Sequence, residues 1–293
     1  MIVGVSELQQ RAERGAEDPG LFGPGSVAWR IHAHQSMLVG GLRALMIQAL
    51  NPRAMAAMEQ HSDYRSDPWG RLMRTGRYIA ETTYGDTATA KAAAARVRAI
   101  HRRISGVDDF TGQPYRADDP ALLLWVHAVE VDSFLTAYRR FGPPLSDSDA
   151  DRYVDEMRNA AELIGLDRDT VPRDLASLDA YLRDQELVAS PAARAALRFL
   201  LCPPVAWPGG RYPPLPGSRL LEVPARAAWT VPTAAAVALL PERARRAYGL
   251  PNLRPLVPLL RLPLEAFMAA FRAAAPPPPH VIEAKRRMRA PAA

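Results

Sequence analysis

The chain is poor in cysteine, in aromatic residues and in long uninterrupted apolar runs. One cysteine, Cys202, among 293 residues excludes an internal disulfide framework and is typical of a protein in a reducing compartment. The most apolar helical stretch, Met37 to Leu50, contains Arg43 and is shorter than the roughly 20 residues that a membrane-spanning helix needs. The N-terminus carries charges where a signal peptide would have its apolar segment. We therefore expect a soluble, cytoplasmic protein without membrane contact.

The chain also lacks a strong charge of one sign and the common motifs of nucleotide, hydrolase and metal sites. Its 37 basic and 31 acidic residues give a net charge of +6, and the two signs are interspersed until a basic tail, Lys285 to Arg289. Nucleic-acid-binding proteins usually gather basic residues on one face, so we expect no nucleic-acid partner. The sequence contains no HExxH, CxxC, GxGxxG, GxxxxGK[ST] or GxSxG.

What the sequence has is a series of helix signals, which predict an all-α protein. Helix-capping residues followed by proline, as in Asp119-Pro120 and Ser190-Pro191, mark helix starts, and glycine or proline marks the ends. The predicted helices are 36–50, 53–61, 67–83, 86–104, 118–141, 147–163, 174–186, 190–201, 234–247 and 255–274. We expect a single globular multi-helix domain over residues 1–275, with a proline-rich connector, 203–216, inside it and a proline-rich basic tail, 276–293.

The last helical segment, 251–274, allows two interpretations. Arg254, Arg261 and Glu265 leave an apolar face that would suit a membrane surface or a partner helix. The same pattern fits a final core helix that packs back on the bundle, and we favour this second interpretation.

Two histidines are candidates for chemistry, and the first is His127. It lies within LLLWVHAVEVDSFLTAY, and its helical neighbours are apolar: Leu123, Leu124, Val131 and Phe134. A buried imidazole without a partner costs roughly 2 kcal/mol or more, so a hydrogen bond or a metal must satisfy it. The pattern alone favours a hydrogen-bonded core histidine over a metal ligand.

The second candidate is His101, in ARVRAIHRRISG. Its helical neighbours are Val97, Arg98 and Ile104, and the small residues Ala92 to Ala95 would let another helix or a flat ligand approach closely. Taken alone, His101 is best interpreted as a polar residue at the edge of an apolar stripe.

Five ordered motifs resemble a bacterial and fungal family that includes the latex clearing proteins, or rubber oxygenases, and the oxygenase of mycophenolic acid biosynthesis. These motifs are LFGPGSVAWR, GGLRALMIQALNPRAMAAMEQHS, DPWGRLMRTGRYIAETTYGD, RVRAIHRRISG and YRADDPALLLWVHAVEVDSFLTAY. The resemblance covers about residues 20–165 well and the rest only loosely. It implies a globin-reminiscent helical fold that holds haem b through a histidine.

The resemblance implies roles for individual residues. His127 corresponds to the family's WVH histidine and would be the proximal iron ligand, with Leu123 and Val131 beside the porphyrin. His101 and Arg98 would lie on the opposite face with Val97, where His101 could ligate the iron or hydrogen-bond bound dioxygen. Arginines of the RALMIQ and RLMRT motifs, Arg43, Arg71 and Arg74, could pair with the haem propionates, although an ordinary ion pair with Glu81 or Asp67 fits equally.

These residues lead to two principal function hypotheses. The first is a haem b oxygenase in which iron activates dioxygen or peroxide toward an apolar small molecule. Rubber oxygenases carry polar groups where this chain has Ala92 to Ala95, which argues against rubber as its substrate. The second is a protein that binds or senses haem, or an apolar ligand, without turnover. A helical interaction module that acts through the basic tail is a weaker third.

Overall fold

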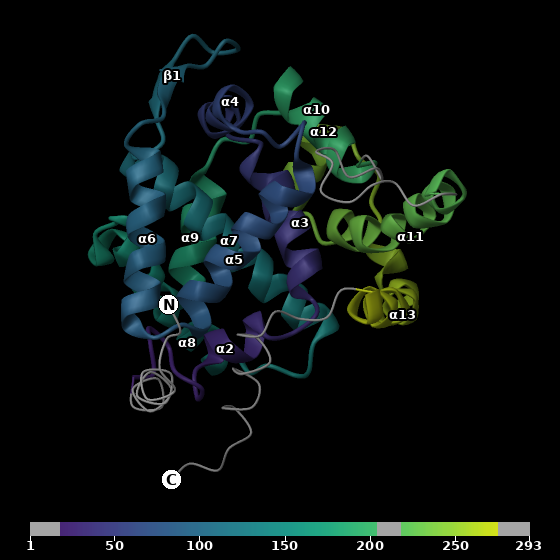
Figure 1. Ribbon diagram of the computed structural model, residues 1–293, viewed down its shortest axis with the longest axis horizontal. Helices are drawn as coiled ribbons and strands as arrows, with labels where there is room; N and C mark the ends of the chain where they lie inside the picture. Colours follow the sequence, from purple (N-terminus) through teal and green to yellow (C-terminus); the bar gives the residue numbers. More distant parts are fainter. Residues whose placement is uncertain (1–17, 204–217, 275–293) are drawn as a thin grey trace, which may run out of the picture.

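The computed structural model describes residues 18–203 and 218–274, which form helices and one short hairpin (Figure 1). The all-α class predicted from the sequence is confirmed. The elements are α2 (Val27–His32), α3 (Met37–Gln48), α4 (Pro52–His61), α5 (Pro68–Tyr84), α6 (Thr87–His101), β1 (Ser105–Val107), β2 (Pro114–Arg116), α7 (Pro120–Phe141), α8 (Asp147–Ile164), η1 (Arg168–Thr170), α9 (Leu175–Asp184), α10 (Pro191–Leu201), α11 (Ser218–Ala238), α12 (Glu242–Tyr248), η2 (Arg254–Leu256) and α13 (Val257–Ala274).

Helix α7 is the central element of the fold. It packs most extensively on α3, and α2, α8 and α9 also contact it. One hydrophobic core joins α3 and α7 to α10, α11, α12 and α13, and a second core joins α7 to α2, α8 and α9. Helices α5 and α6 pack on each other, and α6 also contacts α8. Residues on several sides of α7 are therefore buried.

The length of α7 raises the question of a membrane span. Among the described residues it is the one helix long and apolar enough to cross a bilayer, which makes it a stronger candidate than the stretch from Met37 that the sequence singled out. However, 67% of its most apolar window is buried inside the protein, as is usual for the central helix of a core.

The capping residues predicted from the sequence do begin helices. The side chains of Asp119, Ser146 and Ser190 each accept a hydrogen bond from a backbone N–H in the first turn of α7, α8 and α10. Gly165 ends α8 with φ +104°, a backbone conformation that glycine adopts without a steric penalty.

Several features differ from the predictions, which also omitted α2 and the part of α11 before residue 234. The helix predicted over 234–247 is two helices, because α11 ends at Ala238 and α12 begins after Pro241. Helix α6 ends at His101 rather than at Ile104, because the chain turns there into the hairpin β1–β2, in which Gly106 pairs with Tyr115. The sequence predicted no strands. Most of the predicted connector, from residue 204 on, and the predicted tail lie outside the described residues.

Candidate functional site

His127 lies in the middle of α7, and its side chain is buried in apolar surroundings. The pocket beside it is a narrow gap without room for a water molecule, lined by His127, Ala128, Val131, Val154, Val171, Pro172 and Leu178. Burial lowers the pKa of His127 to about 4, so the imidazole is neutral at pH 7. Within the described part of the chain, neither ring nitrogen has a hydrogen-bond partner. The neutral ring therefore keeps a lone pair that could bind a metal.

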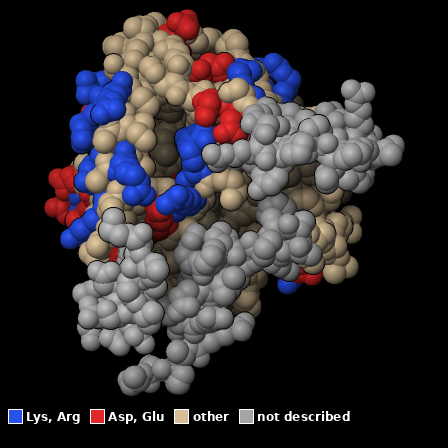
Figure 2. All heavy atoms as spheres, viewed as in Figure 1, with Lys and Arg blue, Asp and Glu red and all other residues tan. Residues whose placement is uncertain are grey.

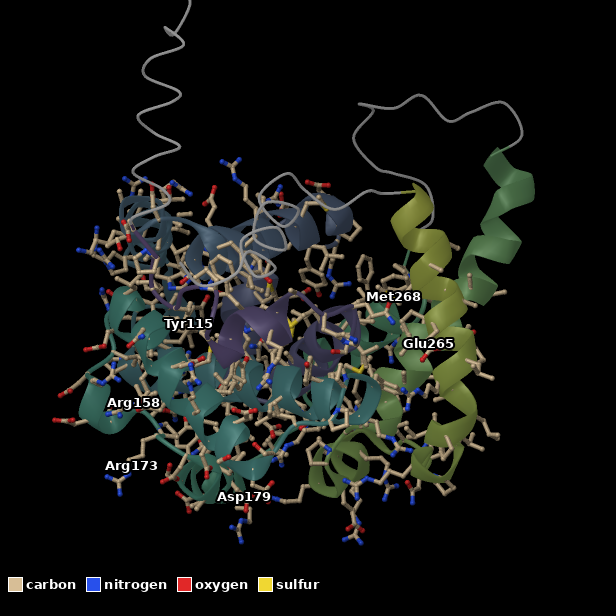
Figure 3. The ribbon with its side chains drawn as sticks, turned by 90° about the horizontal axis from the view of Figure 1, so that it is seen from below. Tyr115, Arg158, Arg173, Asp179, Glu265 and Met268 are labelled. Atoms are coloured by element: carbon tan, nitrogen blue, oxygen red, sulfur yellow. The ribbon has the colours of Figure 1, made fainter. Side chains whose placement is uncertain are left out.

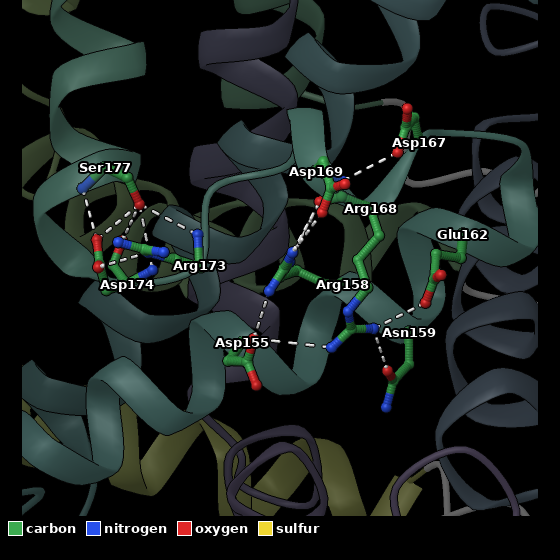
Figure 4. A network of polar contacts seen from close by, with 10 residues as sticks. All are labelled: Asp155, Arg158, Asn159, Glu162, Asp167, Arg168, Asp169, Arg173, Asp174 and Ser177. Carbon is green, nitrogen blue, oxygen red and sulfur yellow. Dashed lines mark hydrogen bonds and ion pairs between the residues drawn. The ribbon is translucent and has the colours of Figure 1, made fainter.

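The far wall of this pocket is the segment that joins α8 to α9, residues 165–174, which supplies Val171 and Pro172. A polar network holds this segment in place (Figure 4). Arg158 of α8 donates to the carbonyl oxygen of Arg168 at 2.9 Å, and Arg168 pairs with Glu162 at 2.7 Å. Asp174 then caps α9 together with Ser177. Both ends of the wall beside His127 are therefore tied to helices.

A second group of polar residues comes from three helices. Glu130 is one turn after His127 on α7, so the two side chains share one side of that helix. Tyr78 of α5 interacts electrostatically with both Glu130 and Arg98 of α6. Burial raises the pKa of Glu130 to about 7 and also raises the pKa of Tyr78. Glu130, Tyr78 and Arg98 therefore bring a carboxyl, a phenol and a guanidinium to one region, and burial leaves the carboxyl about half protonated at pH 7.

The face of the molecule that carries α5 and α6 is hollowed. Figure 2 shows the hollow, with basic side chains at its rim. Val126 of α7, which precedes His127, is 37% exposed although it lies in the middle of the central helix. Helix α7 is thus partly open to solvent beside its buried histidine.

His101 and Arg71 form a second pair on α6 and α5. The pKa of His101 is lowered by burial and further by the positive charge of Arg71, so His101 is also neutral at pH 7. Burial also lowers the pKa of Arg71, whose guanidinium donates a hydrogen bond to the hydroxyl of Thr75 at 3.1 Å. Among the described residues Arg71 forms no ion pair. Arg71 is therefore a largely buried cation without a carboxylate partner.

The other two arginines that the sequence offered for an anionic group are occupied. Arg43 is buried, and its guanidinium donates to Asp132 and Ser133 at 2.7 Å each and to the carbonyl oxygen of Leu239 at 2.9 Å. Arg74 is exposed and pairs with two carboxylates, which include Asp67 at 3.1 Å. Arg43 therefore connects α3 to α7 and to the residue that follows α11, and Arg74 makes the ordinary ion pair that the sequence left open.

The remaining predicted site residues lie on α6 and α7. Leu123 packs with Val171 and two residues of α8 and its C-terminal end, and Val131 lines the pocket of His127. Val97 is half-buried on α6, one residue before Arg98. The guanidinium of Arg98 donates to the carbonyl oxygen of Leu163, at the C-terminal end of α8. Arg98 thus connects α6 to α8 as well as facing Tyr78.

Sequence reasoning missed the part played by two residues. The sequence offered Glu130, or a backbone carbonyl, as an acceptor for the other ring proton of His127, and no such hydrogen bond forms among the described residues; the raised pKa of Glu130 was not foreseen. The sequence also grouped Arg71 with two arginines that prove to be ion-paired. An acidic residue one turn from a buried histidine was a signal for the first. In the described chain, no group of three or more His, Cys, Asp or Glu side chains is placed to hold a metal ion.

Taken together, the fold and the site define an all-helical protein with one buried, unbonded histidine on its central helix. A comparison with models of protein families identifies the family. Residues 29–273 match the model described as ER-bound oxygenase mpaB/B'/Rubber oxygenase, catalytic domain. The chain belongs to this oxygenase family, as the motifs predicted, and the match extends well beyond residue 165. Neither the curated proteins nor the solved structures give a match.

Proposed function

We propose that the protein binds haem b through His127 and acts as an oxygenase on an apolar small molecule. One observation carries the proposal: a buried, neutral imidazole in the middle of the central helix has no hydrogen-bond partner among the described residues. A bond to iron would use the free lone pair of this neutral ring. Membership of an oxygenase family supports the reaction class.

The residues around His127 fit such a group in their chemistry. The gap beside His127 is too narrow to admit a water molecule, so a porphyrin would have to lie in the hollow that Figure 2 shows on the face with α5 and α6. Leu123 and Val131 offer apolar surface beside His127. Arg71 is the arginine left for a propionate, because a buried guanidinium is stabilised by a carboxylate.

When bound, the haem iron would supply the activation of dioxygen or peroxide. The protein would supply the ligand nitrogen of His127, an apolar setting and control of protons. The carboxyl of Glu130 has a pKa of about 7, so it can hold or release a proton near neutral pH. The hydroxyl of Tyr78 keeps its proton and can donate a hydrogen bond. His101 is neutral and could accept a hydrogen bond or act as a second ligand.

The alternative function is a protein that holds haem without turnover. It would use the neutral His101 as a second ligand, although His101 does not line the pocket of His127. The two functions differ in whether an external ligand can reach the iron.

The test is an absorption spectrum of the purified protein, as isolated and after reduction with dithionite in the presence of carbon monoxide. A Soret band that shifts with carbon monoxide is expected, and it would open the way to oxygenase assays on apolar compounds. A haem spectrum that carbon monoxide does not change would favour the binding protein. No Soret band after growth with a haem precursor would refute both.

Matched variants test the residue assignments. His127→Ala should abolish haem retention, whereas His101→Ala should keep haem and alter its spectrum. His61→Ala, on an exposed ring at the end of α4, is the control and should leave both unchanged. Full haem occupancy in His127→Ala would refute the ligand assignment.

A matched pair of variants tests the assignment of Arg71 to a haem propionate. Arg71→Gln should weaken haem binding by about 10- to 100-fold, which corresponds to one lost charge-assisted hydrogen bond. Arg74→Gln lies on the same helix but removes an exposed arginine that is already paired, and it should leave haem affinity unchanged. Equal effects of the two substitutions would contradict the role of Arg71.

A further inference from the structure

Helix α13 has two different faces. Its inner face is part of the main core, where Val257, Leu264 and Met268 are buried and Phe267 meets the ring of Trp229 with centroids 6.4 Å apart. This arrangement is the core helix that the sequence favoured. Figure 3 shows α13 beside α11 at the edge of the molecule, so its other face points away from the bundle.

The outer face of α13 is apolar and exposed. Leu256, Leu259 and Leu262 are 46%, 71% and 76% exposed, and their spacing of three residues places them along one side of the helix. These last two values are the highest among the large hydrophobic residues that are exposed in the described chain. Pro255, Pro258, Pro263 and Ala266 are exposed as well. A continuous apolar surface of this kind in contact with water marks an interaction site.

The charges near this face are mostly positive. Arg254 lies beside the leucines and forms no ion pair in the described part of the chain, whereas Arg261 lies on the other side of the helix from Leu259 and pairs with Glu265 at 3.2 Å. In the sequence, α13 is followed by four prolines and then by Lys285, Arg286, Arg287 and Arg289. Two copies of such a surface would repel each other, whereas a negatively charged surface would attract it.

An apolar helix face with basic residues around it matches what an anionic lipid surface binds. The leucines can enter the boundary between head groups and acyl chains, while the arginines stay at the level of the anionic head groups. Each basic residue near such a membrane adds to the attraction. A membrane surface is therefore favoured over a second copy of the chain.

We infer that the apolar face formed by Leu256 of η2 and by Leu259 and Leu262 of α13, with Arg254 beside it, binds the surface of anionic lipid membranes. This contact is peripheral, and no part of α13 needs to cross the bilayer. It departs from the expectation, based on the sequence, of a protein without membrane contact. The inference does not depend on haem binding.

The experiment is co-sedimentation of the full chain with vesicles of phosphatidylcholine alone or with about 30% phosphatidylserine. We expect at least about tenfold tighter binding to the anionic vesicles, and weaker binding at high salt. The double variant Leu259→Ser/Leu262→Ser should lose about tenfold or more of this affinity. The control Val107→Ser/Phe110→Ser removes two hydrophobic residues of similar exposure, 51% and 53%, from the hairpin region and should bind as the unchanged chain does.

Circular dichroism and urea unfolding establish that each variant is folded before binding is compared. The inference would be overturned if the leucine variant bound the vesicles as tightly as the unchanged chain. It would also be overturned if truncation after Ala275 abolished binding while the leucine substitutions had no effect. A concentration-dependent dimer in size-exclusion chromatography that the leucine variant abolishes, without vesicle binding, would assign the face to a second copy instead.

Discussion

The buried ion pair between Arg43 and Asp132 should respond unequally to removal of its two partners. The side chain of Arg43 is 5% exposed and that of Asp132 is 29% exposed, with 2.7 Å between the guanidinium and the carboxylate. Asp132→Asn leaves a positive charge in the core, held only by Ser133, the carbonyl oxygen of Leu239 and a neutral amide. Arg43→Met leaves a carboxylate that water can still reach.

The expected magnitudes follow from this difference in exposure. An uncompensated buried charge costs about 3–5 kcal/mol, so Asp132→Asn should lower the free energy of unfolding by about 3 kcal/mol. Arg43→Met loses hydrogen bonds but leaves no charge buried, and it should cost about 1–2 kcal/mol. In the double variant the two losses should not add, with a coupling of about 2 kcal/mol.

Urea unfolding at equilibrium measures these values, and an exposed pair provides the control. Asp179→Asn breaks the ion pair with Arg183, in which both side chains are more than 60% exposed, and should cost at most about 0.5 kcal/mol. The reasoning is refuted if Asp132→Asn costs no more than Arg43→Met. The folded Arg43→Met variant should also retain haem, because Arg43 is an internal connector in this structure.

Two further predictions concern Glu130 and Gly165. Since burial raises the pKa of Glu130 from 4.5 to about 7, the folded protein binds more protons than the unfolded chain in this window, and its stability falls as pH rises through it. Glu130→Gln should remove this pH dependence in the haem-free protein and raise the free energy of unfolding at pH 8 by up to about 3 kcal/mol. The control Glu186→Gln, on the surface, should change neither the pH dependence nor the free energy of unfolding. Parallel pH profiles of the Glu130 variant and the unchanged protein would contradict the assignment. Gly165→Ala should lower the free energy of unfolding by about 1 kcal/mol because φ is +104° there. Gly41→Ala, in α3 with open space around it, should raise the free energy of unfolding by a similar amount. Urea unfolding midpoints check both variants, and equal shifts would refute the conformational argument.

The sequence predicted much of the candidate site because helix periodicity is a local property. The spacing of Leu123, His127 and Val131 alone predicts an apolar stripe on one side of the helix. In the structure His127 and Val131 line one pocket, and Leu123 lies beside it. The roles of the arginines could not be predicted in this way. Arg43 is 89 residues from Asp132 and 196 from Leu239 along the chain, so its partners are decided by how α3, α7 and α11 pack.

The exposure of a helix face likewise depends on its neighbours. Arg254, Arg261 and Glu265 showed that segment 251–274 is amphipathic, but the apolar residues could not be divided between a buried and an exposed side without knowledge of what α11 covers. The same holds for Glu130, whose pKa is set by desolvation and not by its sequence neighbours.

By itself, the sequence determined the helical class, the starts of the main helices and the histidine on the central helix, because capping and periodicity act within a few residues. The tertiary structure alone decided which arginine lacks a carboxylate, which carboxyl loses its water and which leucines remain exposed. Those properties arise from contacts between helices far apart in the chain, and no local pattern encodes them.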